Sequence, residues 1–249
     1  MKAALTIAVA ALALAVTGCK KENSANDAAP KPSAPVAPVP APPGSDWTQV
    51  VSDTPEGGYR MGNPNAPVKL VEYASYSCPH CAEFAARGAD PLQNTYVKSG
   101  RVSWEYRPFL LFAADAAIAT LVRCKGAGAS FLITEQIYAQ QPQWESKLQA
   151  LSSDQQQQLN QMNPQQKMKF LIQTTGLDEF FRQRGMTNTQ IDSCLADGKM
   201  VQRAVDITDD ASNNKGVTGT PTFFINGQNV PETATWEKLE PSLKQALGE

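Results

Sequence analysis

The sequence is poor in histidine, in basic charge and in long apolar runs, and each shortage excludes a class of protein. Its 249 residues contain one histidine, which excludes a metal site built from several histidines. Lys and Arg number 22 against 24 Asp and Glu, and charged residues make up only 18% of the chain. A nucleic-acid-binding protein would carry a basic excess, so we expect no nucleic-acid partner. The apolar run at residues 3–16 is shorter than the roughly 20 residues of a membrane-spanning helix.

The amino-terminal residues resemble an export signal. Residues 3–16 follow the single charge of Lys2, and an apolar run of about 7–15 residues is typical of a secretory signal. The residues V-T-G-C at positions 16–19 resemble a bacterial lipobox. This resemblance implies that residues 1–18 are a lipoprotein signal peptide and that the sulfur of Cys19 carries the lipid. The alternative is an ordinary signal, cut nearby, that leaves Cys19 as a stray thiol.

A proline-rich stretch follows the predicted signal. Residues 28–43 hold seven prolines and five alanines in sixteen positions, a composition that cannot bury a core and favours extended polyproline II. At about 3.1 Å per residue the stretch would be a semi-rigid spacer of roughly 50 Å. We therefore expect residues 19–46 to be a lipidated Ala/Pro-rich tether and residues 47–249 to be the folded domain.

The chain has five cysteines, which are Cys19, Cys78, Cys81, Cys124 and Cys194. If Cys19 carries a lipid, four remain, and four cysteines allow three disulfide pairings. Cys78 and Cys81 are close enough in sequence to pair when oxidised, which leaves Cys124 to pair with Cys194. Export favours disulfides over zinc thiolates, and the second pair is too widely spaced for a four-cysteine zinc site. We expect no metal and no cofactor.

The first cysteine pair lies where a strand gives way to a helix. Residues 68–74 form a β-rich run of strand length, and C-P-H-C at positions 78–81 begins a run of good helix formers. Pro79 suits the first turn of a helix, where its missing N–H costs nothing. Residues 101–107 alternate apolar and polar side chains and predict the next strand. This order predicts a parallel βαβ unit with Cys78 at the helix N-terminus.

This position predicts different reactivities for the two cysteines. The thiolate is the nucleophile, so a lower pKa means a more reactive cysteine. A helix N-terminus stabilises an anion by about 0.3–1 kcal/mol, and each charged hydrogen bond adds about 1.5–3 kcal/mol. His80 and the free N–H groups of the first helical turn are candidate donors. We expect Cys78 to be the reactive thiolate, Cys81 to be shielded and to resolve mixed disulfides, and His80 to tune Cys78.

Glu72 occupies an unusual position for a carboxylate. On a strand it shares a face with Val68, Leu70 and Ala74, and a central parallel strand is buried on both faces. We therefore expect Glu72 to be buried, to have a raised pKa, and to exchange protons with Cys81. The alternative is a partly exposed residue at a sheet edge.

A second strand-like segment lies late in the chain. Residues 222–225 are strand-like, Asn226-Gly227 is a strong hairpin turn, and residues 228–230 return. Pro221 at the start of a strand cannot donate to the ladder, and a cis peptide bond there would explain its presence.

Together these motifs resemble the DsbA branch of the thioredoxin superfamily. The resemblance rests on C-P-H-C after a strand, on Glu72 six residues before it, and on Thr220-Pro221 before the late hairpin, and covers about residues 61–247. It implies an α/β thioredoxin fold, oxidation of exported proteins through a mixed disulfide at Cys78, and a cis Pro221. It also implies that the backbone at Thr220 pairs with substrate as a short added strand.

Residues 112–216 read as a helical insertion within that fold. Helical spacing recurs along this stretch, and Ser152 with Gln155 and Thr187 with Gln190 form capping-box patterns. A Cys124–Cys194 disulfide would staple the first inserted helix to a late one, as in some relatives of the best-known oxidase.

The resemblance leaves three functions open. The first is a thiol:disulfide oxidase, re-oxidised by a quinone-linked DsbB-like membrane partner. The second is an isomerase or reductase, because Thr220 before the cis proline is typical of isomerases whereas the best-known oxidases have valine. The third is a non-enzymatic surface lipoprotein. We expect a monomer that acts on reduced or misfolded exported proteins on the periplasmic side of the cell envelope, with the choice between inner and outer membrane open.

Overall fold

The computed structural model describes residues 34–249. The predicted signal peptide (residues 1–18), the predicted lipidation site Cys19 and most of the predicted tether lie outside these residues and stay predictions. Among the described residues, no single helix is long and apolar enough to cross a membrane.

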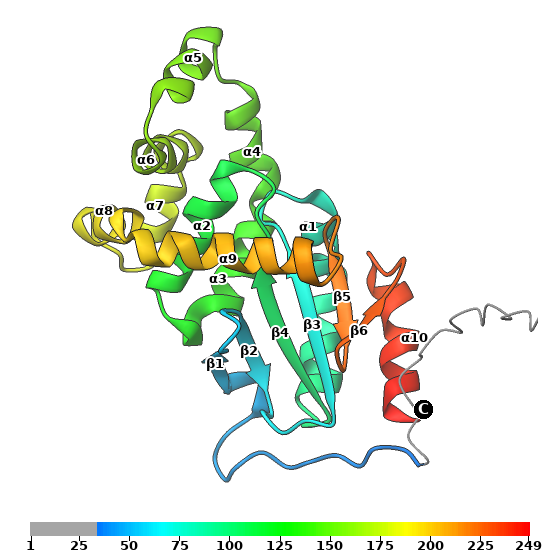
Figure 1. Cartoon of the computed structure of the whole chain (residues 1–249). Coiled ribbons are helices and arrows are strands. Elements are labelled where there is room, and N and C mark those ends of the chain that lie inside the picture. The colour runs from blue at the N-terminus through cyan, green and yellow to red at the C-terminus, as the bar shows by residue number, and fades with distance from the viewer. Residues whose placement is uncertain (1–33) are drawn as a thin grey trace, which may run out of the picture.

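A six-stranded mixed sheet forms the centre of the molecule (Figure 1), with strand order β1-β2-β4-β3-β5-β6. The strands are β1 (Val51–Asp53), β2 (Tyr59–Gly62), β3 (Val68–Ala74), β4 (Val102–Pro108), β5 (Thr222–Ile225) and β6 (Gln228–Val230). Only β3 and β4 pair in parallel, and α1 (Pro79–Pro91) connects them. The predicted βαβ unit is therefore present, and so is the predicted hairpin between β5 and β6.

Helices cover both faces of the sheet. On one face α1 and α10 (Trp236–Leu247) pack against the core side of β3, where Leu70 and Ala74 are buried. On the other face α9 (Gly198–Asn214) packs through Ile207 and Ala211 against Tyr73 and Phe224. Figure 1 shows α9 crossing in front of the sheet with α1 behind it. Successive side chains of β3 therefore point to opposite faces of the sheet and pack into two separate apolar layers.

Between β4 and β5 the chain forms a helical insertion, as expected. Besides α9, its helices are α2 (Ala113–Cys124), α3 (Ser130–Ala139), α4 (Gln141–Gln149), α5 (Ser153–Gln161), α6 (Pro164–Thr175), α7 (Leu177–Arg182) and α8 (Asn188–Ala196). Short helical turns occur at η1 (Trp47–Gln49), η2 (Leu92–Val97) and η3 (Ala127–Ala129). The predicted capping boxes begin α5 and α8, with Ser152 and Thr187 as their N-caps. The fold class predicted from the sequence is confirmed.

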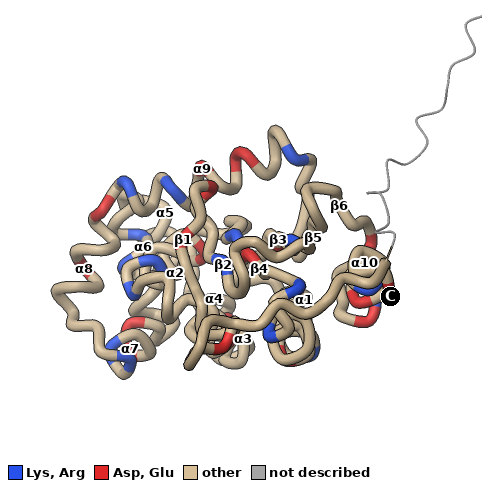
Figure 2. Tube along the Cα trace, turned by 90° about the horizontal axis from the view of Figure 1, so that it is seen from below, with Lys and Arg blue, Asp and Glu red and all other residues tan. Residues whose placement is uncertain are grey.

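Residues 36–47 form a strap across one end of the sheet. The Val36 N–H donates to the carbonyl of Leu247, and the Val39 N–H donates to the carbonyl of Ser99, both at 2.9 Å. The Trp47 indole N–H donates to the Val39 carbonyl at 2.8 Å. Figure 2 views the molecule from this side and shows the strap running from α10 towards β1, with Asp46 near its end as its one charged residue. The carboxyl-terminal part of the predicted tether therefore lies on the domain, which shortens any free spacer.

Candidate active site

Cys78 lies at the carboxyl end of β3 and forms the N-cap of α1. Its backbone is extended, with φ −85° and ψ 119°, and Pro79 occupies the first turn of the helix. The Cys78 thiol donates to the carbonyl of Thr220 at 3.2 Å. Cys78 and Cys81 are both unpaired thiols in the structure. The backbone N–H groups of His80 and Cys81, in the first turn of the helix, face the sulfur of Cys78, and the Cys81 N–H also donates to the Cys78 carbonyl at 3.1 Å.

These surroundings lower the pKa of Cys78 to about 5. The largest cause is a hydrogen bond from the Cys81 thiol, and burial opposes it. The Thr220 hydroxyl, placed to donate once the sulfur is ionised, and the backbone N–H groups of Cys81 and His80 lower the pKa further. A pKa of about 5 makes Cys78 a thiolate at neutral pH. The N–H groups at the helix N-terminus contribute, as predicted, but the largest cause is the Cys81 thiol, which the sequence analysis did not name as a donor.

Cys81 lies one turn inside α1 and is fully buried. Burial is the largest cause that raises its pKa well above the ordinary value, and the hydrogen bond to Cys78 and the charges of Cys78 and Glu72 add to it. The two sulfurs therefore differ in pKa more than in burial: Cys78 is 6% exposed and has the lowered pKa, whereas Cys81 is fully shielded and has the raised one.

His80 follows Pro79 on the exposed side of the first turn. Its backbone N–H lowers the pKa of Cys78 by hydrogen bonding to the sulfur. Its imidazole has no hydrogen bond in the described part of the chain. The tuning that the sequence assigns to the imidazole thus stays a prediction, whereas the backbone contribution is visible.

Glu72 is buried beneath the cysteine pair, with 2% of its surface exposed. The indole N–H of Trp104 donates to Glu72 Oε2 at 3.0 Å. Burial is the main cause that raises the pKa of Glu72 to about 8, and the charge of Cys78 contributes. A small cavity of about 10 Å³ adjoins the carboxylate and is lined also by Tyr106 and Tyr138. The alternative of a partly exposed edge residue is wrong, because β3 lies between β4 and β5.

Thr220 and Pro221 lie directly beside Cys78, although 142 residues separate Thr220 from it in sequence. The Thr220–Pro221 peptide bond is cis, as predicted. Register explains the proximity, because Thr222 at the start of β5 pairs with Tyr73 near the end of β3. The Thr220 hydroxyl is buried without a hydrogen-bond partner.

Three residues that the sequence analysis did not single out hold the turn before α1. Asp115 of α2 accepts hydrogen bonds from the backbone N–H and the hydroxyl of Ser77 at 2.9 and 3.0 Å. Tyr138 of α3 donates to the Ser75 carbonyl at 3.0 Å, and Gln141 of α4 donates to two further carbonyls of the turn. Asp115 is the one acidic residue of a mostly apolar helix, which is a signal that the sequence offered, whereas Gln141 begins a polar helix and carries no such signal.

Cys124 and Cys194 form the disulfide predicted from the cysteine count. The bond joins α2 to α8, with Cα atoms 6.2 Å apart and 70 residues between them. It lies in the insertion, apart from the reactive pair.

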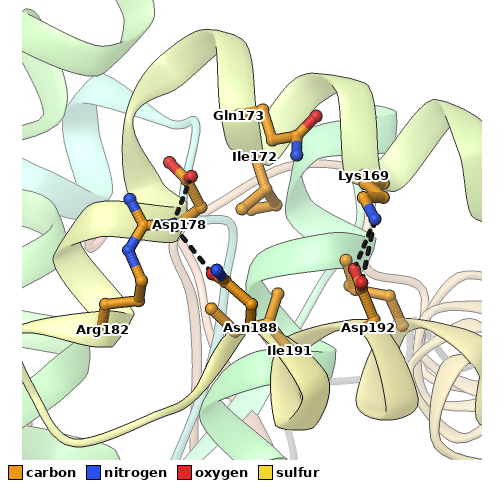
Figure 3. Close-up of a pocket in the computed structure, with 9 residues that line it drawn as sticks. Lys169, Ile172, Gln173, Asp178, Arg182, Asn188, Ile191 and Asp192 are labelled. Carbon is orange, nitrogen blue, oxygen red and sulfur yellow. Dashed lines mark hydrogen bonds and ion pairs between the residues drawn. The ribbon is translucent and has the colours of Figure 1, made fainter.

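A separate hollow of about 230 Å³ lies between α6, α7 and α8 (Figure 3). Its charged side chains neutralise one another: Arg182 pairs with Asp178 at 2.7 Å, and Lys169 pairs with Asp192 at 2.8 Å. Within residues 34–249, no group of three Cys, His, Asp or Glu side chains is placed to hold a metal ion. The cysteine pair at the end of β3 is therefore the candidate active site.

Comparison with known proteins agrees with this geometry. The family model described as thioredoxin matches residues 54–245, so the chain belongs to the thioredoxin family. Within that family it is similar to DsbA-type thiol:disulfide oxidoreductases, which were expected from the C-P-H-C motif. A Rickettsia bellii protein, provisionally named a protein-disulfide oxidoreductase, is 26% identical over 192 residues, which cover 76% of this chain and 64% of that protein.

Two solved structures share the fold. A protein-disulfide isomerase from Novosphingobium aromaticivorans is 28% identical with a TM-score of 0.73, covering 76% of this chain and 97% of that one. Wolbachia pipientis alpha-DsbA1 is 19% identical with a TM-score of 0.63, covering 81% of this chain and 96% of that one. The chain spans less than two thirds of the length of these Rickettsia relatives. It covers 64% of the Rickettsia bellii protein and 52% of a Rickettsia felis protein that carries the same description.

Proposed function

We propose that this protein is a thiol:disulfide oxidase that transfers the Cys78–Cys81 disulfide to proteins in the cell envelope. The observation that carries the proposal is the contrast between the two sulfurs. The pKa of Cys78 falls to about 5, whereas that of Cys81 rises. A stabilised thiolate favours the reduced form, and a couple whose reduced form is stabilised is a strong oxidant.

Oxidation would proceed in two exchanges. A substrate thiolate attacks the Cys78 sulfur, the Cys78–Cys81 bond breaks, and Cys81 leaves as a thiolate. Because the pKa of Cys81 is high, this leaving sulfur takes up a proton. Glu72 has a pKa of about 8 and is protonated at neutral pH, so we assign it the role of the buried donor.

The second exchange releases the product. A second substrate thiolate attacks the substrate sulfur of the mixed disulfide, and Cys78 leaves as the stable thiolate. The substrate has then lost two electrons and gained a disulfide, and the protein holds two reduced cysteines. We assign substrate pairing to the backbone at Thr220, because its carbonyl lies 3.2 Å from the reactive sulfur and the next strand begins two residues later.

The proposal includes a partner and a location. Each turnover leaves the protein reduced, so it needs a disulfide-bearing membrane protein linked to quinones to regenerate it. The export signal and the lipobox-like residues in the sequence favour the periplasmic side of the envelope, with a lipid anchor at Cys19, and we propose that the protein acts there as a monomer.

An isomerase is the second candidate, and two observations favour it. Thr220 occupies the position before the cis proline, and the relative of known structure from Novosphingobium aromaticivorans is described as a protein-disulfide isomerase. An isomerase would need Cys78 and Cys81 to be reduced in the cell, because it begins as a nucleophile rather than as a disulfide.

The test measures the redox potential of the Cys78–Cys81 pair against glutathione, together with oxidation of a reduced, unfolded protein. An oxidase predicts a potential near that of glutathione or above it, and stoichiometric oxidation that Cys78→Ser abolishes. Alkylation of free thiols in intact cells should then find the pair oxidised. A reducing potential and a reduced pair would favour the isomerase, and activity retained by Cys78→Ser would exclude both.

A further inference from the structure

The helical insertion reaches the reactive turn through one buried amide. We infer that Gln141 is a positioning residue for Cys78, which it holds in the geometry that stabilises the thiolate. This role rests on the function proposed above and extends it to a residue outside the thioredoxin core.

Gln141 hydrogen-bonds to the turn before α1 on both sides of Ser77. Its Nε2 donates to the Tyr76 carbonyl at 2.7 Å and to the Cys78 carbonyl at 3.0 Å. Gln141 has only 3% of its surface exposed, so water does not compete with its amide for these carbonyls. One amide group therefore uses both of its N–H bonds on the carbonyls of the residues before and after Ser77.

The Cys78 carbonyl also belongs to the first turn of α1. It accepts the backbone N–H groups of Cys81 and Ala82, each at 3.1 Å. The peptide group between Cys78 and Pro79 is thus fixed from inside the helix and, through Gln141, from outside it. Its orientation sets where the N–H groups of His80 and Cys81 lie relative to the sulfur, and those two groups lower the pKa of Cys78.

The insertion holds Gln141 firmly. Trp144 is buried one turn further along α4, and its indole N–H donates to the Ile137 carbonyl of α3 at 3.1 Å. From the same α3, the Tyr138 hydroxyl donates to the Ser75 carbonyl at 3.0 Å. The inserted helices therefore form a rigid frame around the turn, and Gln141 is the member of that frame that bonds to Cys78 itself.

The experiment compares Gln141→Met with Gln143→Met in the full chain. Methionine keeps the unbranched shape of glutamine and removes both donors, and Gln143 is an exposed glutamine on the same helix. For Gln141→Met we expect the pKa of Cys78, measured by thiolate absorbance, to rise by about one unit, a tenfold change in the ionisation constant. The redox potential should fall with it, and Gln143→Met should change neither.

The acidic and thiol groups that act on Cys78 are the same in both variants. They are Cys81, Glu72, and Glu145 of α4, whose own pKa is raised by burial first and then by the charges of Asp115 and Cys78. A shift confined to Gln141→Met is therefore assigned to the lost hydrogen bonds and not to a change of charge.

Stability in the two redox states separates positioning from plain structural support. Positioning predicts that Gln141→Met destabilises the reduced protein more than the oxidised one, because only the reduced form carries the thiolate. Equal loss in both states with an unchanged pKa of Cys78 would overturn the inference. If Gln141→Met does not fold, Gln141→Asn keeps the amide, draws it back by one methylene, and is held to the same criteria. An unshifted Cys78 in the unaltered protein would instead overturn the proposed function itself.

Discussion

Thr220 offers two polar groups to Cys78, one for each protonation state of the sulfur. Its carbonyl accepts the Cys78 thiol at 3.2 Å. Its hydroxyl is buried and unpaired while Cys78 is a thiol, and it lowers the pKa of Cys78 by donating to the thiolate. A buried unpaired hydroxyl costs free energy, so this group has its partner only when the proton has left.

Replacing this hydroxyl should weaken the thiolate. In Thr220→Val a methyl group takes the place of the donor at almost unchanged volume, and we expect the pKa of Cys78 to rise above about 5. Titration of thiolate absorbance in the reduced protein measures this directly. The oxidised protein should keep its stability or gain about 1 kcal/mol, because the unpaired hydroxyl is gone. A pKa equal to that of the unaltered protein would show that the hydroxyl has no role.

Glu72 should make stability fall as pH rises. Burial raises its pKa from 4.5 to about 8, so the folded state binds the proton more tightly than the unfolded state does. Below about pH 4.5 the carboxyl is protonated in both states, and its titration does not change the free energy of unfolding. Between about pH 4.5 and 8 that free energy falls, by about 1.4 kcal/mol per pH unit in mid-range.

Glu72→Gln removes this titration and keeps the shape of the side chain. We expect its free energy of unfolding, relative to the unaltered protein, to rise between about pH 4.5 and 8 and to level off above that range. Denaturant unfolding of the reduced protein, the state to which this pKa applies, at several pH values gives this difference. A constant difference across the range would mean that Glu72 titrates as an ordinary carboxyl.

Among the elements, the amino-terminal strap depends on one glycine. Gly100 has φ +73°, and a Cβ placed there would lie 2.2 Å from the Val39 carbonyl oxygen and 2.6 Å from the Trp47 indole nitrogen. Both atoms belong to the strap, so the close approach of the strap to the sheet requires a residue without a side chain.

Gly100→Ala should therefore release the strap. We expect a loss of about 1–2 kcal/mol in the free energy of unfolding and faster proteolytic cleavage before Trp47. Gly216→Ala is the matched control, because Gly216 has φ +69° with no atom within 4 Å of an added Cβ. If both variants are cleaved at the same rate, backbone strain rather than the contact explains the effect.

Local sequence patterns predicted the elements that carry the cysteines. Pro79 at the first helical turn placed Cys78 at the N-terminus of α1, and alternation along β3 placed Glu72 in the core. The strands β1 and β2 were not predicted: they are as short as β6 and β5, but no Asn-Gly turn of the kind that marks the late hairpin joins them.

The contacts of Asp115, Tyr138 and Gln141 could not be predicted in the same way. They join the turn before α1 to residues 38 to 65 positions further along the chain. Periodicity describes neighbours within one element, and it carries no information about which helix of an insertion will meet a given turn.

At the scale of the whole molecule, the Cys124–Cys194 disulfide closes a span of 70 residues. In chain-entropy terms such a cross-link stabilises the fold by about 4 kcal/mol at most. We expect the free energy of unfolding of the double variant Cys124→Ala/Cys194→Ala to fall by up to that amount. The redox potential of the Cys78–Cys81 pair should stay unchanged. Denaturant unfolding with that couple held reduced in both proteins measures the loss. Unchanged stability would show that the unfolded chain is already compact across this span.

The strap and the reactive sulfur lie at opposite ends of the central strands of the sheet. Val39 bonds to Ser99, just before β4 begins, whereas Cys78 follows the carboxyl end of the parallel neighbour β3 (Figure 1). A molecule fastened to a bead, a chip or a bilayer through its amino-terminal side would accordingly turn the active-site end of the sheet, with Cys78, away from the support and towards the surrounding solution. Fastened through a graft near α5, the same molecule would have its sulfur turned towards its own support.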